Sequence, residues 1–350
     1  MQNTVNRRRF LSLAALGAAA TQFAGLKALH AAPAIAPKQN SHFISRKLSS
    51  FSDIKQVKTS LLDIGYAEAG PANGPVIILL HGWPYDIHSY AEVAPLLAAH
   101  GFRVLIPHLR GHGTTRFLSP ETPRNGQQSA IAADIIEFMD ALKIRSAVIG
   151  GFDWGARTAN IIAALWPERC KTLISVSGYL IGSQQANQKP LSPKAELSWW
   201  YQYYFSTERG YNGYKENRNE FAKLIWQTAS PKWNFDEATF NRSAASLENP
   251  DHVDIVINNY RWRVGLTKGE SKYDAYEQTL AGFPDIQVPT VTIEGDANGA
   301  PHPKPEDYAR RFKGKYKHIT LAGGVGHNPP QEAPDEFAAA VLEAISMTKE

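Results

Sequence analysis

One aspartate stands where a short apolar run meets a helical pattern, and its type and setting suit it to chemistry. Residues 147–157 read Ala-Val-Ile-Gly-Gly-Phe-Asp-Trp-Gly-Ala-Arg, with a Gly-x-Asp-x-Gly turn between the two patterns. Gly151 and Gly155 would let a strand and a helix approach each other on either side of a strained residue. An ionised carboxylate can displace a leaving group at a saturated carbon and form an ester on the enzyme. Asp153 is therefore a candidate nucleophile.

Two further candidates follow later apolar runs. Asp296 comes after the run at 288–294, and His327 comes after the run at 317–321. We expect His327 to take a proton from the water that attacks the Asp153 ester, and Asp296 to orient the imidazole and stabilise its charged form. Glu294 is a weaker candidate for this acid, because it precedes the glycine of its turn and lies within the strand.

Another apolar run, at 76–80, ends in His-Gly-Trp-Pro at 81–84. When water attacks an enzyme-bound ester, the carbonyl oxygen becomes an oxyanion that backbone N–H groups can stabilise. The N–H groups of Trp83 and Trp154 are the predicted donors, so these residues form the predicted oxyanion hole.

The elements that must position these residues alternate along the chain. This alternation predicts an α/β fold with a doubly wound, mostly parallel sheet, whose ligands bind at the carboxyl ends of the strands. Strands are expected at 76–80, 103–107, 147–149, 173–177, 288–294 and 317–321, with two weaker ones within 51–75; helices are expected at 88–99, 129–142, 156–166, 305–312 and 334–347.

The alternation stops between 179 and 283, where helical patterning and five of the eight tryptophans lie. This segment is predicted to be a helical cap inserted into the core, with a disordered or extended stretch around 184–193. The predicted organisation is a signal peptide at 1–34, a linker at 35–50, the first part of the core at 51–178, the cap at 179–283 and the second part of the core at 284–350.

The N-terminus differs in kind from the rest of the chain. Three arginines at 7–9 precede Phe-Leu, a mild apolar run and Ala-Pro-Ala at 32–34, a pattern similar to a bacterial twin-arginine export signal. The sequence therefore predicts a periplasmic or secreted protein. The apolar run is too short and too rich in Ala and Gly to span a bilayer comfortably, so we expect no stable membrane insertion after cleavage.

The amino-acid composition limits the classes of partner that we expect for this protein. Residues 1–34 hold four of the 37 Lys and Arg residues and no Asp or Glu. The remaining chain therefore has 33 basic and 33 acidic residues and is about neutral. With no basic stripe, nucleic acid is not an expected partner. The single Cys170 excludes an intramolecular disulfide, and no Cys/His cluster has zinc spacing, so neither a metal nor a cofactor is expected. The expected partner is a small-molecule substrate, and homodimerisation is left open.

Over roughly 50–347, the chain resembles the α/β-hydrolase family, with Asp153 in place of the usual nucleophilic serine. The Asp153 turn and the His-Gly-x-Pro turn look like those of the epoxide hydrolase and haloalkane dehalogenase branches. Tyr-Gln-Tyr-Tyr-Phe at 201–205 and Asn-Tyr-Arg-Trp at 259–262 are similar to two cap stretches of epoxide hydrolases. The resemblance implies that Tyr201 and Tyr260 protonate the epoxide oxygen, and that these tyrosines, Trp83 and Trp154 contact the substrate.

The expected function is cofactor-independent hydrolysis of apolar or aromatic epoxides to diols. A haloalkane dehalogenase using the same three residues is the alternative, although Trp83 stands where that branch usually has a halide-binding Asn. A defluorinating relative would have Arg in place of Trp154. Two departures, Phe152 where His is common and His108 where Asp is common, leave a non-catalytic ligand-binding protein as an alternative of another class. A serine esterase is disfavoured, because the turn has no Ser.

Overall fold

The computed structural model describes residues 51 and 53–348 of the chain. The predicted signal peptide at 1–34 and linker at 35–50 lie outside the described residues. Among the helices of the described part, none is long and apolar enough to cross a membrane.

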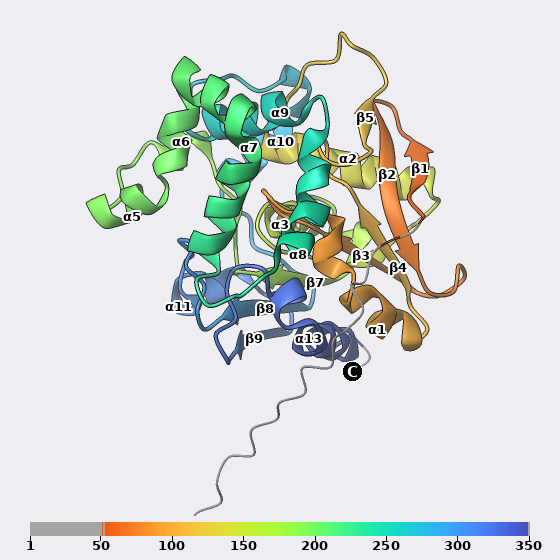
Figure 1. Ribbon diagram of the computed structural model, residues 1–350. Helices are drawn as coiled ribbons and strands as arrows, with labels where there is room; N and C mark the ends of the chain where they lie inside the picture. The colour runs from red at the N-terminus through yellow and green to blue at the C-terminus, as the bar shows by residue number, and fades with distance from the viewer. Residues whose placement is uncertain (1–50, 52, 349–350) are drawn as a thin grey trace, which may run out of the picture. The chain divides into compact units, whose positions relative to one another are not determined.

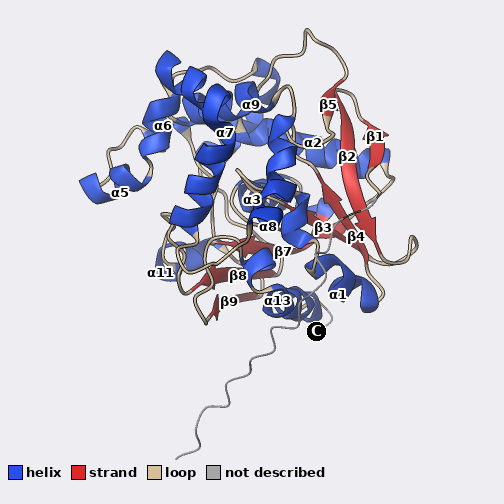
Figure 2. Cartoon of the chain, viewed as in Figure 1, coloured by secondary structure: helices blue, strands red, loops and turns tan. Residues whose placement is uncertain are grey.

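A mixed sheet of nine strands forms the centre of the fold (Figure 2). Its order is β1-β2-β4-β3-β6-β7-β8-β9, with the short β5 paired to β2. The strands from β4 to β9 along this order run parallel, whereas β2 is antiparallel to β1, β4 and β5. The predicted α/β class with a mostly parallel sheet is thus confirmed. The strands are β1 Lys55–Lys58, β2 Leu62–Ala69, β3 Val76–Leu80, β4 Arg103–Pro107, β5 Arg116–Phe117, β6 Ala147–Gly151, β7 Cys170–Val176, β8 Thr290–Gly295 and β9 Tyr316–Leu321.

Two apolar layers cover the two faces of this sheet. Side chains alternate along β3, so that Ile77 and Leu79 join one buried cluster while Ile78 and Leu80 join the other. Helices α1 (Val93–Ala99) and α13 (Pro334–Ser346) complete the first layer, and α2 (Gln128–Ala141) and α3 (Trp154–Leu165) complete the second. A strand buried on both faces is continuously apolar, which explains why β3 was recognisable from its sequence.

Between β7 and β8 the chain forms a run of helices that Figure 1 shows grouped together beside the sheet. The stretch expected to be disordered or extended around 184–193 instead contains a short helix, because the side chain of Ser183 accepts a hydrogen bond from the backbone N–H of Ala186 and caps the helix. The cap helices are α4 Gln184–Asn187, α5 Pro193–Ser198, α6 Trp200–Phe205, α7 Glu208–Ala229, α8 Glu237–Ala244, α9 His252–Arg263 and α10 Asp274–Ala281. Short helices elsewhere are α11 Pro305–Tyr308 and α12 Pro329–Glu332.

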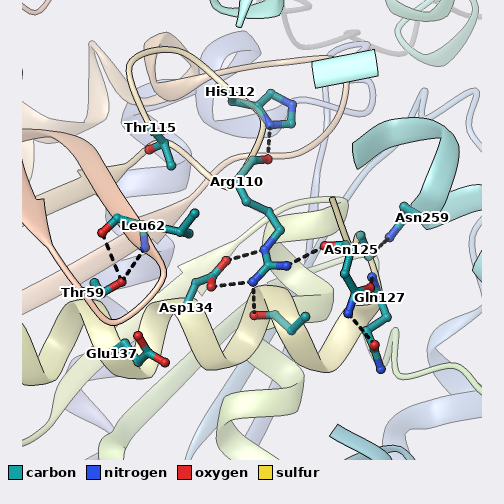
Figure 3. Close-up of polar contacts among 12 residues, drawn as sticks. Thr59, Leu62, Arg110, His112, Thr115, Asn125, Gln127, Asp134, Glu137 and Asn259 are labelled. Carbon is teal, nitrogen blue, oxygen red and sulfur yellow. Dashed lines mark hydrogen bonds and ion pairs between the residues drawn. The ribbon is translucent and has the colours of Figure 1, made fainter. Parts of the chain in front are cut away.

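A buried ion pair fixes the loop on which the cap rests (Figure 3). Arg110, in the loop after β4, donates to both carboxylate oxygens of Asp134 on α2 at 2.6 Å and to the carbonyl of Asn125. Asn259 of cap helix α9 then donates to the backbone carbonyl of Gly126. Because a buried charge is costly unless it is paired and hydrogen-bonded, this pairing holds the loop in one arrangement.

Candidate active site

Asp153 occupies the sharp turn between β6 and α3. Its backbone angles are φ 51° and ψ −120°, a region that residues other than glycine rarely adopt. A Cβ added to Gly155 would lie 1.9 Å from the carbonyl oxygen of Leu80, and one added to Gly151 would lie 2.4 Å from the carbonyl carbon of Gly155. Both flanking positions therefore require glycine, and the turn presents the Asp153 side chain beyond the end of the sheet.

The Asp153 carboxylate faces a backbone donor and a histidine. The backbone N–H of Trp83 donates to Oδ1 over 2.8 Å, and Nε2 of His327 lies 3.6 Å from Oδ2. Burial raises the pKa of Asp153, but His327, Arg157 and the Trp83 N–H outweigh it and hold that pKa below its usual value. The residue is thus ionised at neutral pH, as a carboxylate nucleophile must be.

The two predicted oxyanion donors lie in different local settings. The Trp83 N–H already donates to the Asp153 carboxylate, whereas the Trp154 N–H is the first of helix α3 and has no acceptor within that helix. The Trp83 indole is also held: Nε1 donates to the Tyr214 hydroxyl at 2.8 Å, and that hydroxyl lies 2.8 Å from Nε2 of His252. Sequence reasoning missed this connection between the cap and the core, because neither Tyr214 nor His252 belongs to a recognisable motif.

The loop that carries His327 is held by two residues that sequence reasoning also missed. The backbone N–H of His327 donates to the hydroxyl of Ser230, which donates to Glu332. Glu332 further accepts from the backbone N–H groups of Gly326 and Asn328. An acid in the first turn of α12, directly after the histidine loop, was the available signal.

The expected contact between Asp296 and His327 is not formed. Asp296 is exposed, and its two carboxylate oxygens accept hydrogen bonds from the backbone N–H groups of Gly323 and Gly324 at 3.1 and 2.8 Å. Nδ1 of His327 is buried and has no hydrogen-bond partner among the described residues. Since a short polar side chain readily bonds to backbone nearby, Asp296 is used to hold the loop before His327 instead of the ring itself.

Glu294, the weaker candidate for the acid, is buried and likewise does not bond to the histidine. Its Oε1 accepts from the side chain of Asn298 at 2.7 Å, and its Oε2 lies 3.8 Å from Nε2 of His302. Within the described residues, neither candidate carboxylate orients the His327 ring.

The two cap tyrosines are brought together near Asp153, on α6 and α9. Their rings meet edge to face with centroids 5.4 Å apart, and Trp83 packs against both. Burial raises the pKa of Tyr201 and of Tyr260, and the Asp153 charge raises both further. Both phenols therefore keep their protons at neutral pH. Tyr201 lines the cavity, whereas Tyr260 is 1% exposed and packs behind it.

A cavity of about 450 Å³ opens in front of Asp153, a volume that suits a small organic molecule. Among the residues that line it are Trp83, Asp153, Arg157, Tyr201, Arg263 and His327. No group of histidine, cysteine and acidic side chains in the described part of the chain could hold a metal ion.

The two departures from the family pattern have packing explanations. Phe152 is fully buried and packs edge to face on Tyr85, with centroids 5.1 Å apart. His108 is buried beside His81, and burial lowers the pKa of His108 to about 4, so the ring is neutral. Neither side chain lines the cavity.

The sheet order, the strained aspartate turn and the inserted cap together define an α/β hydrolase with an aspartate in the nucleophile position. Residues 75–296 match the sequence pattern of the alpha/beta hydrolase fold family, so the chain belongs to that family.

The individual proteins to which this chain is similar include several that are named as epoxide hydrolases. The crystal structure of a candidate epoxide hydrolase from Klebsiella pneumoniae is 62% identical, with a TM-score of 0.84 over 85% of this chain and 98% of that one. Epoxide hydrolase A of Mycobacterium tuberculosis is 25% identical over 313 residues, which cover 83% of this chain and 96% of that protein. An epoxide hydrolase from Vigna radiata has a similar fold, with a TM-score of 0.66 at 20% sequence identity. The match covers 84% of this chain and 98% of that one.

Proposed function

We propose that this protein is an epoxide hydrolase that forms a covalent ester on Asp153 and releases a diol. The observation that carries the proposal is that one cavity holds both an ionised carboxylate, Asp153, and a protonated phenol, Tyr201, with the buried phenol of Tyr260 packed behind Tyr201. An epoxide needs both groups, because its leaving oxygen becomes an alkoxide that must be protonated, whereas a departing halide needs no proton. The similarity to epoxide hydrolases supports the same activity.

Ring opening uses the geometry around Asp153. Oδ1 is held by the Trp83 N–H, which leaves Oδ2 free to attack a ring carbon. The C–O bond of the epoxide breaks, and its oxygen takes a proton from Tyr201, with Tyr260 stabilising the resulting phenolate. The product of this step is a hydroxyalkyl ester of Asp153.

Hydrolysis of that ester needs a base. His327 Nε2 lies on the Oδ2 side of Asp153, so it can take a proton from the water that attacks the ester carbonyl. The oxyanion forms on Oδ1, where the Trp83 N–H already sits and the Trp154 N–H can join it. The tetrahedral intermediate then collapses with cleavage of its Cγ–Oδ2 bond, and the departing alkoxide takes the proton of the newly added hydroxyl, which restores the Asp153 carboxylate. His327 returns its proton to the phenolate, so the net reaction is epoxide plus water to diol.

Intact-mass spectrometry of a His327→Gln variant tests this mechanism, because losing the base should trap the ester. After incubation with a panel of epoxides and haloalkanes, we expect an adduct with the whole mass of an epoxide. The matched control is the double variant Asp153→Ala, His327→Gln, which should form no adduct. An adduct short of the halogen acid would instead assign a haloalkane dehalogenase. An adduct that persists in the double variant would exclude Asp153 as the nucleophile.

We further propose that the enzyme acts outside the cytoplasm on a small molecule, without a metal or organic cofactor. The arginine-led N-terminus supports export, and the mechanism above needs no group beyond protein side chains.

A further inference from the structure

Two arginines line the cavity, and no proposed step of bond making or proton transfer uses either side chain, although Arg157 helps to keep Asp153 ionised. Arg157 lies on α3 one turn after Asp153, and Arg263 is the last residue of cap helix α9. Within the described residues, neither guanidinium forms an ion pair with a carboxylate. Since charged side chains at protein sites are normally paired, two unpaired guanidiniums in one cavity indicate a binding role.

Each arginine is held in place by contacts that leave donors free. Nε of Arg157 donates to the carbonyl of Leu180 at 3.2 Å, which fixes the side chain but leaves its terminal N–H groups without an acceptor among the described residues. The Arg263 guanidinium lies over the rings of Trp199 and Tyr260, at 5.1 and 5.5 Å from their centroids. Cation–π contacts orient a guanidinium without neutralising it.

The charges that line the cavity do not balance. Asp153 is the one acidic residue among the described lining residues, against Arg157 and Arg263, so these three side chains together carry one excess positive charge. Burial, followed by repulsion from Arg263, lowers the pKa of Arg157 to about 10, so Arg157 is still charged at neutral pH. A single negative charge on the substrate would restore the balance.

We infer that the substrate is an epoxide that carries a carboxylate, bound by Arg157 and Arg263. This inference rests on the proposed epoxide opening at Asp153 and specifies its substrate class. Guanidinium groups bind carboxylates through paired N–H donors, and the tryptophans beside Arg263 offer an apolar wall for the remainder of the substrate.

The spacing of Asp153 and Arg157 also limits the distance between the reacting ring and the charge. Asp153 directly precedes α3, and the backbone N–H of Arg157 donates to the carbonyl oxygen of Asp153 over 3.0 Å, so the two residues are neighbours across the first turn of the helix. A carboxylate held by Arg157 therefore places an adjacent ring carbon within reach of Asp153, whereas a charge at the far end of a long chain would not. An epoxide with its carboxylate on a ring carbon fits this spacing.

Binding of an inert analogue tests the inference without turnover. In trans-cinnamate an alkene replaces the epoxide of 3-phenyloxirane-2-carboxylate, and cinnamamide is its neutral isostere. By titration calorimetry, we expect the protein to bind cinnamate at least about tenfold more tightly than cinnamamide. Arg157→Gln and Arg263→Gln should each reduce this ratio at least about tenfold, and added salt should reduce it as well. Because both constants come from one preparation, a loss of folded protein cancels in the ratio.

Arg209→Gln is the matched control, since Arg209 is exposed on α7, lies outside the cavity, and loses the same charge. Its ratio should equal that of the unaltered protein. Failure of cinnamate to bind more tightly than cinnamamide, including no measurable binding of either, would overturn the inference, as would an unchanged ratio in both arginine variants.

Labelling of the His327→Gln variant separates this inference from the proposed function. If cinnamate is preferred but neither 3-phenyloxirane-2-carboxylate nor its amide forms an ester, the anion site stands and epoxide opening fails. If the amide forms an ester while cinnamate is not preferred, epoxide opening stands and the carboxylate specificity fails.

Discussion

The backbone N–H of Gly324 donates a hydrogen bond to Oδ1 of Asp296 across 2.8 Å, and the N–H of Gly323 donates to Oδ2. These bonds attach the end of β8 to the loop that carries His327. Asp296 thus contacts the loop and not Nδ1 of the His327 ring, so we expect it to act on His327 by positioning that loop.

The variant Asp296→Asn distinguishes this role from direct orientation of the ring. An amide keeps one acceptor oxygen for the loop, so we expect kcat to fall by about tenfold or less, in contrast with about 10⁴-fold where an Asn replaces the acid that bonds the ring. Steady-state kinetics with the epoxide measure the kcat of this variant. Asp274→Asn, at the exposed start of α10, is the control. A loss of 10³-fold or more would show that Asp296 contacts His327 in the working enzyme.

The two cap tyrosines should contribute unequally. Tyr201 lines the cavity and Tyr260 packs behind it, so Tyr201→Phe should slow ester formation by about 10²- to 10⁴-fold and Tyr260→Phe by less. Rapid-quench measurement of the Asp153 ester reports this step alone. Tyr203→Phe, on the exposed face of the same helix α6, is the control. Equal effects of the two single variants would contradict the predicted order, and no effect in the double variant would remove both phenols from the mechanism.

Tyr214→Phe should destabilise the folded protein and also lower the rate of the reaction. The change removes the hydroxyl that hydrogen-bonds to both Trp83 Nε1 and His252 Nε2. Both nitrogen atoms are then buried without a partner. We expect a loss of about 2–4 kcal/mol in the free energy of unfolding, measured by urea denaturation. Tyr276→Phe on α10 is a suitable control. A loss below about 0.5 kcal/mol would mean that water satisfies both groups.

Four buried histidines predict a loss of stability in acid. Burial is the first cause that lowers the pKa of His81, His108, His112 and His252, with His108 and His112 at about 4. The unfolded chain takes up protons on these residues near pH 6.5, whereas the folded protein does not, so this stability is present above pH 6.5 and is lost as the pH falls towards 4.

The expected slope is up to about 1.4 kcal/mol per pH unit for each histidine. Urea denaturation between pH 7.5 and pH 5 measures it. The exposed residue His100, changed to Gln, should leave the slope unaltered. A free energy of unfolding that stays constant over this range would show that the rings are protonated in the folded protein.

Export depends on the arginines at the N-terminus if the proposed signal is correct. Replacing Arg7, Arg8 and Arg9 together by lysine keeps the positive charge but removes the guanidinium groups of the motif. We expect the protein to remain in the cytoplasm as the longer precursor, which cell fractionation and immunoblotting would detect. Lys27→Arg serves as the control. Unchanged export of the triple variant would exclude a twin-arginine route.

The α/β class and the position of the strands could be predicted from sequence, because strands buried on both faces are continuous apolar runs and the helices between them have their own period. β3 and β4 occupy the predicted residues, and β6 differs only at its end. The short β5 and the helix at 184–187 escaped prediction, since a two-residue strand has no pattern and the helix depends on one Ser183 cap.

The sequence by itself determined the sharp turn at Asp153, because glycine is the one residue that fits at positions 151 and 155 beside the strained backbone of Asp153. Only the tertiary structure decided what surrounds Asp153. The hydrogen bonds of Asp296 to a loop, the different depths of Tyr201 and Tyr260, and the meeting of Arg157 with Arg263 join residues far apart in the chain. No local pattern encodes such contacts, since they form only when distant parts of the chain, loops at the carboxyl ends of the strands and helices of the cap, pack together.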